Sequence, residues 1–491
     1  MRSVGLLAIA MLFLCGNASA ERTVWYVHPD SALNTIQAGL DSCADNDIVL
    51  VGPGTYYENI VWPNTQGIHL VSELGSDLTI IDGDSTNRVI EISTWVDTTS
   101  VIRGFTIRNG LDTLGAGIYC GAYSSPIITH NNITNNIAGV VDPLTGGGVG
   151  AGIYCDSGSA PAIISNNITN NIARGVEARG GGIVCSYSTP TIANNIITNN
   201  KAQAWFCATG GGISCVHSSP VISGNTITYN IAAAGGECYG SGIYCSHSSP
   251  LITGNGFSDN GICCGSSSSP VIDSCTLENS GLSLLNNSSP FISNCTITNH
   301  GVYCQFDCSP TIENCVITTN GNEPGISCTY GCNAVIQHCD IFECDPGILC
   351  LWDNNVTVHY CNIYNNLGYG ICREQSSIII NAINNWWGDA TGPYHPMLNP
   401  GGLGDAVSDY VDFEPWLSWP VGVEERPVVK PVDTPESLTA TIFRGPLQLP
   451  EGKKCRVYDI TGRVVEPSKI QPGIYFIEAD GIVTQKVAKV R

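Results

Sequence analysis

Two acidic residues, Asp273 and Glu313, occupy equivalent positions of a sequence repeat. Each lies three residues after a proline, and prolines recur every 20 residues at Pro250, Pro270, Pro290 and Pro310. If each repeat forms one coil of stacked strands, the two carboxyl groups stand two coils apart, about 9.6 Å. Inverting glycosidases separate their two carboxyl groups by about 6.5–9.5 Å. Asp273 and Glu313 are therefore candidate catalytic residues of a hydrolase, with two solvated surface acids as the alternative.

Imidazole and aromatic side chains recur at two further positions of the repeat. His217 and His247 lie three residues before successive prolines, and Tyr187 lies one repeat earlier. Two stacked imidazoles could ligate a metal, but no third ligand is evident, and a surface stack is the alternative. The remaining aromatic residues precede a cysteine or lie in longer segments, and they could bind sugar rings: Tyr119, Tyr154, Tyr244, Tyr303, Trp205, Phe206 and Tyr239. Ordinary strand residues are their alternative, because strands favour aromatic side chains.

Cysteine is abundant, with 24 residues in the chain. In-register neighbours of a parallel stack lie about 4.8 Å apart, whereas a disulfide needs Cβ atoms about 3.8 Å apart. We therefore expect most cysteines to be buried free thiols. Two pairs are candidate disulfides, Cys207 with Cys238 and Cys308 with Cys332. The spacing of Cys304 to Cys308 and of Cys328 to Cys332 also resembles a zinc site, but the repeat accounts for it.

The elements that carry these residues are short strands joined by turns. Apolar residues alternate, as in Ile243 and Cys245 around Tyr244, which predicts half-buried strands. A coil of about 20 residues holds three short strands and three turns. The position five residues after each proline is predicted to form one inward column, which holds Asn131, Asn166, Asn195, Asn225 and Asn255, then Cys275, Cys295, Cys315, Cys339 and Cys361. Stacked amides hydrogen-bond from coil to coil, and stacked thiols pack as small hydrophobes.

The pattern Gly-Ile-Tyr-Cys, then Ser-Pro-x-Ile-x-x-Asn-x-Ile-x-x-Asn, resembles the repeat of right-handed parallel β-helix proteins of the pectate-lyase-like fold. The resemblance covers about Val24 to Leu417. It implies an all-β fold, a parallel β-helix solenoid with an N-terminal cap helix, followed by a small C-terminal β-sandwich-like domain. We expect the helix over Ser31–Ala44 and the first buried strand over Ile48–Val51.

Lyases of this fold typically use an arginine or lysine base beside acidic calcium ligands. Between residues 110 and 420 the basic residues are Arg174, Arg179, Lys201 and Arg373. Only Glu177 accompanies those in the long segments, so a lyase site is disfavoured. We expect no cofactor, with calcium as the alternative at a second acidic group that otherwise serves turns: Asp340, Glu343, Asp345 and Asp353.

The sequence predicts six segments. Residues 1–20 have the pattern of a secretory signal peptide, 21–110 form the N-terminal cap and first coils, and 111–385 form the repeats. Residues 386–418 resemble the closing cap of such solenoids, 419–436 form a linker, and 437–491 form a small β domain. Four repeats are lengthened at one turn, which predicts a wall of stacked insertions: Ile137–Ala151, Ile172–Gly181, Lys201–Gly211 and Ile231–Ser241.

The C-terminal segment reads as strands at Arg456–Tyr458, Gly473–Ile477 and Val483–Val490. Its motif from Val457 to Val465, followed by Pro472–Phe476, is similar to the sorting domain of the bacterial type IX secretion system. The resemblance implies export through that secretion machinery and release or attachment at the outer cell surface. A small Ig-like adhesion module is the alternative.

The net charge of −22 argues against nucleic acid and anionic membranes as partners, and no segment is long and apolar enough to span a membrane. We expect a secreted, non-catalytic protein that binds an extracellular polysaccharide or cell-surface glycan, or serves in adhesion or structure. The alternative is a polysaccharide lyase or glycoside hydrolase. The identity of the ligand stays open at this stage.

Overall fold

The computed structural model describes residues 22–93, 95–139, 146–321 and 323–422, and in the C-terminal part 441–443, 455–459, 465–467, 473–479 and 482–489. The predicted signal peptide and most of the predicted linker lie outside these residues. The chain divides into two compact units at Val423 and Glu424, and each is described by itself.

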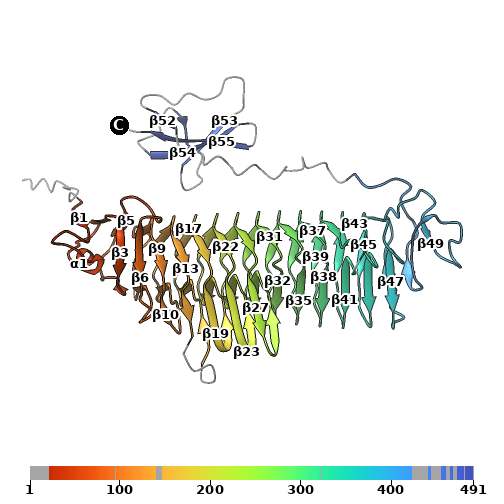
Figure 1. The fold of residues 1–491 in the computed structure, drawn as a ribbon. Helices are drawn as coiled ribbons and strands as arrows, with labels where there is room; N and C mark the ends of the chain where they lie inside the picture. Colours follow the sequence, from red (N-terminus) through yellow and green to blue (C-terminus); the bar gives the residue numbers. More distant parts are fainter. Residues whose placement is uncertain are drawn as a thin grey trace, which may run out of the picture. The chain divides into compact units, whose positions relative to one another are not determined.

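The first unit is a parallel β-helix whose described coils contribute one strand to each of three sheets (Figure 1). Sheet A has 16 strands from β1 (Val24–Val27) to β51 (Val411–Asp412). Sheet B has 13 strands from β3 (Gly54–Tyr57) to β46 (Asn362–Tyr364). Sheet C has 13 strands from β4 (Ile60–Val61) to β47 (Ile371–Glu374). The predicted solenoid is therefore confirmed.

A single coil shows why this sequence folds into a β-helix. It comprises β30 (Leu251–Thr253), β31 (Gly256–Ser258) and β32 (Ile262–Gly265). The central residue of each of the first two strands, Ile252 or Phe257, points inward and is buried. Gly254 (φ 61°) makes the bend between them with a single left-handed residue. Glycine and asparagine favour this conformation, which is why they recur at the turns.

The predicted inward column after each proline is confirmed. The Asn195 amide nitrogen donates to Asn225 Oδ1 at 3.0 Å and to the Ile163 carbonyl at 2.8 Å, and the neighbouring coils repeat this pattern. In later coils Cys295 takes the position, and its thiol contacts the equivalent carbonyl of Ile272 at 3.6 Å. A second ladder, which the sequence analysis did not identify, runs through Asn136, Asn171, Asn200, Asn230 and Asn260.

The cysteines from Cys43 to Cys372 are free, and all of them but Cys43, Cys207 and Cys238 are buried. Neither predicted disulfide is present. Cys207 pairs in register with Glu237, and Cys238 pairs with Ala208. The two cysteines are therefore one residue out of register, which points their side chains to opposite faces of the sheet. Cys308 and Cys332 lie at the same turn of adjacent coils as buried thiols.

The four lengthened turns form a sheet of their own rather than irregular loops. Its strands extend beyond the coils at one side (Figure 1). The strands of this insertion sheet are β10 (Leu111–Asp112), β14 (Ile137–Ala138), β15 (Gly148–Val149), β19 (Ile172–Arg179), β23 (Lys201–Thr209), β27 (Ile231–Ala234) and β28 (Glu237–Tyr239). Each insertion runs outward and returns, and each arm pairs in parallel with the same arm of the next coil.

The two arms of the insertion sheet meet across alanines. Ala138, Ala173, Ala178, Ala202 and Ala208 are fully buried and form a small core separate from the main one. The approach is close, because a Cβ added at Gly148 would lie 2.0 Å from the Ala138 carbonyl oxygen. Only small residues therefore fit between the arms.

The N-terminal helix α1 (Ile36–Asp41) is shorter than the predicted Ser31–Ala44. Thr35 caps it by accepting a hydrogen bond from the Ala38 amide at 3.3 Å, so the helix begins five residues later than predicted. Ile36 and Leu40 are fully buried against the first coil, and the next strand is β2 (Ile48–Val51), as predicted. At the other end of the solenoid, Trp387 is fully buried in the cap that includes β49 (Pro393–Tyr394) and β50 (Gly404–Ala406).

In the second unit, the described residues form a four-stranded sheet of order β52-β55-β54-β53. The strands are β52 (Thr441–Phe443), β53 (Cys455–Asp459), β54 (Gly473–Ala479) and β55 (Ile482–Lys489). The last three overlap the predicted strands. In the described part of the chain, no helix has the length and apolar character needed to cross a membrane.

Candidate ligand-binding groove

An open groove of about 680 Å³ lies where sheets A and B meet near the N-terminal end. Five successive coils line it, mainly through the bends between the two sheets. The strands that contribute are β5 (His69–Ser72), β8 (Val101–Arg103), β13 (Asn132–Thr134), β18 (Asn167–Thr169) and β22 (Ile196–Thr198). Since coils repeat about every 4.8 Å, the groove extends about 20 Å along the solenoid axis.

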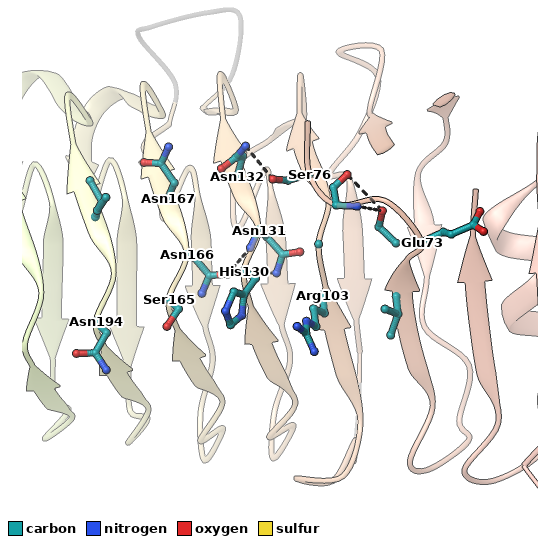
Figure 2. A pocket seen from close by; sticks show the side chains of 15 residues that line it. Glu73, Ser76, Arg103, His130, Asn131, Asn132, Ser165, Asn166, Asn167 and Asn194 are labelled. Carbon is teal, nitrogen blue, oxygen red and sulfur yellow. Dashed lines mark hydrogen bonds between the residues drawn. The ribbon is translucent and has the colours of Figure 1, made fainter. Parts of the chain in front are cut away.

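Two rows of polar side chains face this groove (Figure 2). Arg103, His130, Ser165 and Asn194 lie across neighbouring coils in one row, and Asn132 and Asn167 lie in a second row. His130, Ser165 and Asn194 point outward for the same reason. Each makes the left-handed bend between sheets A and B, with φ of 55°, 56° and 54°.

The floor beneath these rows is the buried asparagine ladder. The side-chain nitrogen of Asn131 donates a hydrogen bond to Asn166 Oδ1 at 3.2 Å, so these amides stabilise the fold. Asn132 donates to Ser76 Oγ at 3.1 Å. The side chains of Ser165, Asn167 and Asn194 make no hydrogen bond to other described residues. Their hydroxyl and amide groups therefore remain available to a ligand.

The groove carries one unpaired cation. Arg103 is exposed and forms no ion pair within the described residues. The acid of the groove, Glu73, accepts a hydrogen bond from the Tyr26 hydroxyl at 3.0 Å. The sequence analysis missed Arg103 because its search for basic residues began at residue 110. Its position directly after the apolar pair Val101–Ile102 could have identified it.

Asp273 and Glu313 occupy one outward column two coils apart, with Ser293 between them, as expected. Asp273 Oδ1 accepts hydrogen bonds from Ser293 Oγ at 2.7 Å and Asn294 Nδ2 at 2.5 Å. These hydrogen bonds are typical of a structural carboxylate that joins neighbouring coils. The groove lies several coils away, so it does not include the pair.

The aromatic candidates stack on one another. Tyr119 lies 5.7 Å from Tyr154 between ring centroids, and Tyr239 lies 6.0 Å from Tyr244. His217 is 4.7 Å from both Tyr187 and His247. In such a stack each ring covers the faces of its neighbours, which leaves ring edges for a ligand. Trp205 and Phe206, at 65% and 62% exposure, stand apart at the tip of the insertion sheet.

A cluster that the sequence analysis did not identify joins His300, Tyr303 and Glu323 on the outer side of sheet C. One carboxylate oxygen of Glu323 lies 2.6 Å from His300 Nδ1, and the other accepts from the Tyr303 hydroxyl at 2.5 Å. Burial and this hydrogen bond raise the pKa of Tyr303. The three residues come from adjacent coils of unequal length, so the 20-residue spacing gave no signal for them.

Within the described residues, no group of three or more histidine, cysteine or acidic side chains converges to hold a metal ion. The second acidic group, expected to be a weak calcium site or turn residues, does not gather into such a site. Asp340 instead accepts a hydrogen bond from Asn362 at 2.7 Å. Burial raises the pKa of its carboxyl group.

A comparison with known protein families identifies the family of the solenoid. Residues 57–256 and 241–386 match the family described as right handed beta helix region. The chain belongs to this family. The predicted right-handed parallel β-helix is thereby confirmed.

Similar solved structures include the Azotobacter vinelandii mannuronan C-5 epimerase AlgE6 A-module, at 12% identity and a TM-score of 0.30, which covers 77% of this chain and 94% of that chain. Another is the catalytic unit of a thermostable GH87 alpha-1,3-glucanase from Streptomyces thermodiastaticus strain HF3-3, at 11% identity and a TM-score of 0.27, covering 77% and 66%. At these scores neither carries an argument about this chain. No curated protein matches the sequence.

Proposed function

We propose that this β-helix protein is a non-catalytic carbohydrate-binding protein and that an extracellular polysaccharide lies along the groove. The observation that carries the proposal is the group of unengaged hydroxyl and amide side chains on two adjacent coils, Ser165, Asn167 and Asn194. Asparagine and serine offer both donors and acceptors, which suits the hydroxyl groups of sugars. The axial direction of the groove suits an extended polymer.

The charge of the protein restricts which polysaccharides can bind. The net charge of −22 repels densely charged polyanions, whereas Arg103 can hold a single carboxylate with two parallel hydrogen bonds. The ligand is therefore a neutral polysaccharide or one with scattered acidic groups.

The proposal includes the site of action. Residues 1–20 direct secretion, and the C-terminal sheet serves as a sorting domain for type IX secretion, which places the protein at the outer cell surface or in the medium. Deletion of residues 437–491 in the native bacterium should trap the protein inside the cell envelope. Export at the wild-type level after this deletion would contradict the sorting role.

Binding is tested by a glycan array, followed by titration calorimetry with each polysaccharide that binds. Arg103→Ala should weaken binding about 10-fold or more, because a hydrogen bond to a charged group contributes about 1.5–3 kcal/mol. Asn194→Ala should weaken binding about 3- to 10-fold, because a neutral hydrogen bond contributes about 0.5–1.5 kcal/mol.

Asn314→Ala is the matched control. Asn314 has the same left-handed bend, with φ of 52°, but lies outside the groove. Any backbone strain from alanine is therefore common to both asparagine variants. An equal loss in Asn314→Ala, or an array without bound glycans, would contradict the proposal.

A second candidate function is polysaccharide turnover at the His300 cluster. Glu323 holds His300 through Nδ1, which orients the other ring nitrogen as a general base, while Tyr303 keeps its proton and can act as the acid. Screening on diverse polysaccharides should then show turnover that disappears in His300→Gln and persists in the groove variants. Turnover lost instead in Asp273→Asn or Glu313→Gln would place the chemistry at that pair.

A further inference from the structure

Cysteine side chains form long inward columns along the solenoid. In sheet C the strands carrying them are paired in register, so each sulfur lies above the next. Leu284 interrupts this column and divides it into a long and a short part. The long part is Cys120, Cys155, Cys185, Cys215, Cys245 and Cys264, and the short part is Cys304, Cys328 and Cys350; all nine are fully buried.

The repeat distance of these columns matches a metal geometry. Neighbouring parallel strands lie about 4.7–4.9 Å apart. A metal–thiolate bond is about 2.3 Å, so two thiolates on opposite sides of one ion lie about 4.6 Å apart. Each gap between successive sulfurs can therefore hold one linear, two-coordinate ion with little movement of the backbone.

The short column ends on a buried charge that forms no ion pair with any described residue. Arg373 follows Cys350 in register and is only 5% exposed. Its Nη2 donates to the Asn354 carbonyl and to Ser376 Oγ, but Nε and Nη1 have no hydrogen-bond partner within the described residues. A buried cation without an anionic partner is costly.

We propose that the cysteine columns bind soft monovalent d10 metal ions, with Cu(I) as the physiological ion, and that the short column closed by Arg373 is the principal site. Thiolates select Cu(I) over harder ions. Each ion lies between two successive sulfurs, and filled gaps alternate with empty ones, because a thiolate in a straight column cannot bond to ions on opposite sides. Binding displaces thiol protons and changes no oxidation state.

Charge balance favours monovalent ions in this apolar interior. One monovalent ion between the thiolates of Cys328 and Cys350 leaves one negative charge, which Arg373 neutralises, while Cys304 keeps its proton. In the long column each bound ion replaces one thiol proton, so the column remains uncharged. Zinc in structural sites requires four convergent ligands, which a straight column does not offer.

The test uses the full-length protein under anaerobic conditions. It is produced with copper supplementation, so that ions can enter during folding, and a Cu(I) chelator then removes loosely bound metal. Copper per chain is measured by mass spectrometry, and X-ray absorption determines the ligand atoms. The expected result is several copper ions per chain, each with two sulfur neighbours.

Three variants locate the ions. Cys328→Leu, which copies Leu284 in the same column, should remove the ion of the short column. Arg373→Gln keeps every thiol and should make that ion removable by the chelator. Cys263→Ser is the control, because Cys263 is buried at 2% exposure but pairs with Tyr244 and Ser283 rather than with cysteines.

The proposal is overturned if Cys263→Ser loses as much copper as Cys328→Leu, or if the wild type retains no sulfur-bound copper after chelation. Circular dichroism shows whether each variant is folded. Arg373→Gln decides the matter if Cys328→Leu does not fold, because unchanged copper retention in Arg373→Gln would contradict the assigned site.

Discussion

At the scale of single residues, the inward position after each proline shows how different side chains satisfy one requirement. The carbonyl of the preceding coil needs a donor, and either the amide of Asn195 or the thiol of Cys295 reaches it. The amide also accepts a hydrogen bond from the Asn166 backbone N–H at 2.9 Å and donates to Asn225 at 3.0 Å, whereas a thiol accepts at a longer distance, as Cys361 does from a backbone N–H at 3.4 Å. Asparagine therefore satisfies more groups, whereas cysteine is adequate where neighbouring thiols pack closely.

Asn195→Ala should lower the free energy of unfolding by about 1–3 kcal/mol, since it leaves buried partners in two coils without hydrogen bonds. Asn195→Cys should cost less, because the thiol restores the contact with the carbonyl. Urea denaturation of the purified protein measures both. Asn194→Ala, at the exposed neighbouring position, is the control. Equal costs for the alanine and cysteine variants would refute this account of the ladder.

At the scale of elements, the insertion sheet depends on small residues between its arms. Repeat register, rather than a large apolar core, holds the arms together, because each arm pairs with the same arm of the next coil. The arms place Trp205 and Phe206 at their tip. This sheet is thus a separate element built on the solenoid, with few large apolar contacts of its own.

Ala173→Leu should force the two arms apart, at a cost of about 1–3 kcal/mol from overpacking. Hydrogen exchange should report the change as faster exchange in residues 172–179 and 201–209, with sheets A and B still protected. Arg174→Leu adds the same side chain on the exposed face of the same strand. Faster exchange throughout the solenoid, or in both variants alike, would show that the arms are not an independent element.

At the scale of the whole molecule, a solenoid must protect both ends, because an uncovered coil offers strand edges and apolar side chains to another chain. Helix α1 covers the first coil with Ile36 and Leu40. Glu58 fixes the start of the helix by accepting hydrogen bonds from the amides of Ile36 and Gln37 at 2.7 and 2.9 Å. Trp387 closes the other end.

Leu40→Asp should release this cap, because an unpaired carboxylate cannot remain in the apolar interior. We expect self-association through the exposed first coil, measured as an increase in mass by light scattering after gel filtration. Asp41→Ala, at the exposed end of the same helix, should leave the mass unchanged. A Leu40→Asp protein with the mass of the wild type would mean that α1 is not needed as a cap.

The sequence by itself determined the winding of this protein. A fixed period, alternating apolar residues and turn residues at regular intervals are local features, and each coil repeats them, so the columns containing Asn195 and Cys295 followed directly. It also established that Asp273 and Glu313 share a column.

Only the tertiary structure decided which residues form the groove and which partners each side chain has. Arg103, Asn132 and Asn194 line one groove because turns of consecutive coils lie side by side. The register within the insertion sheet separated Cys207 from Cys238, since a shift of one residue reverses the face of a strand. The burial of Arg373 against Cys350 likewise depends on coils of unequal length, whose alignment no fixed sequence spacing records.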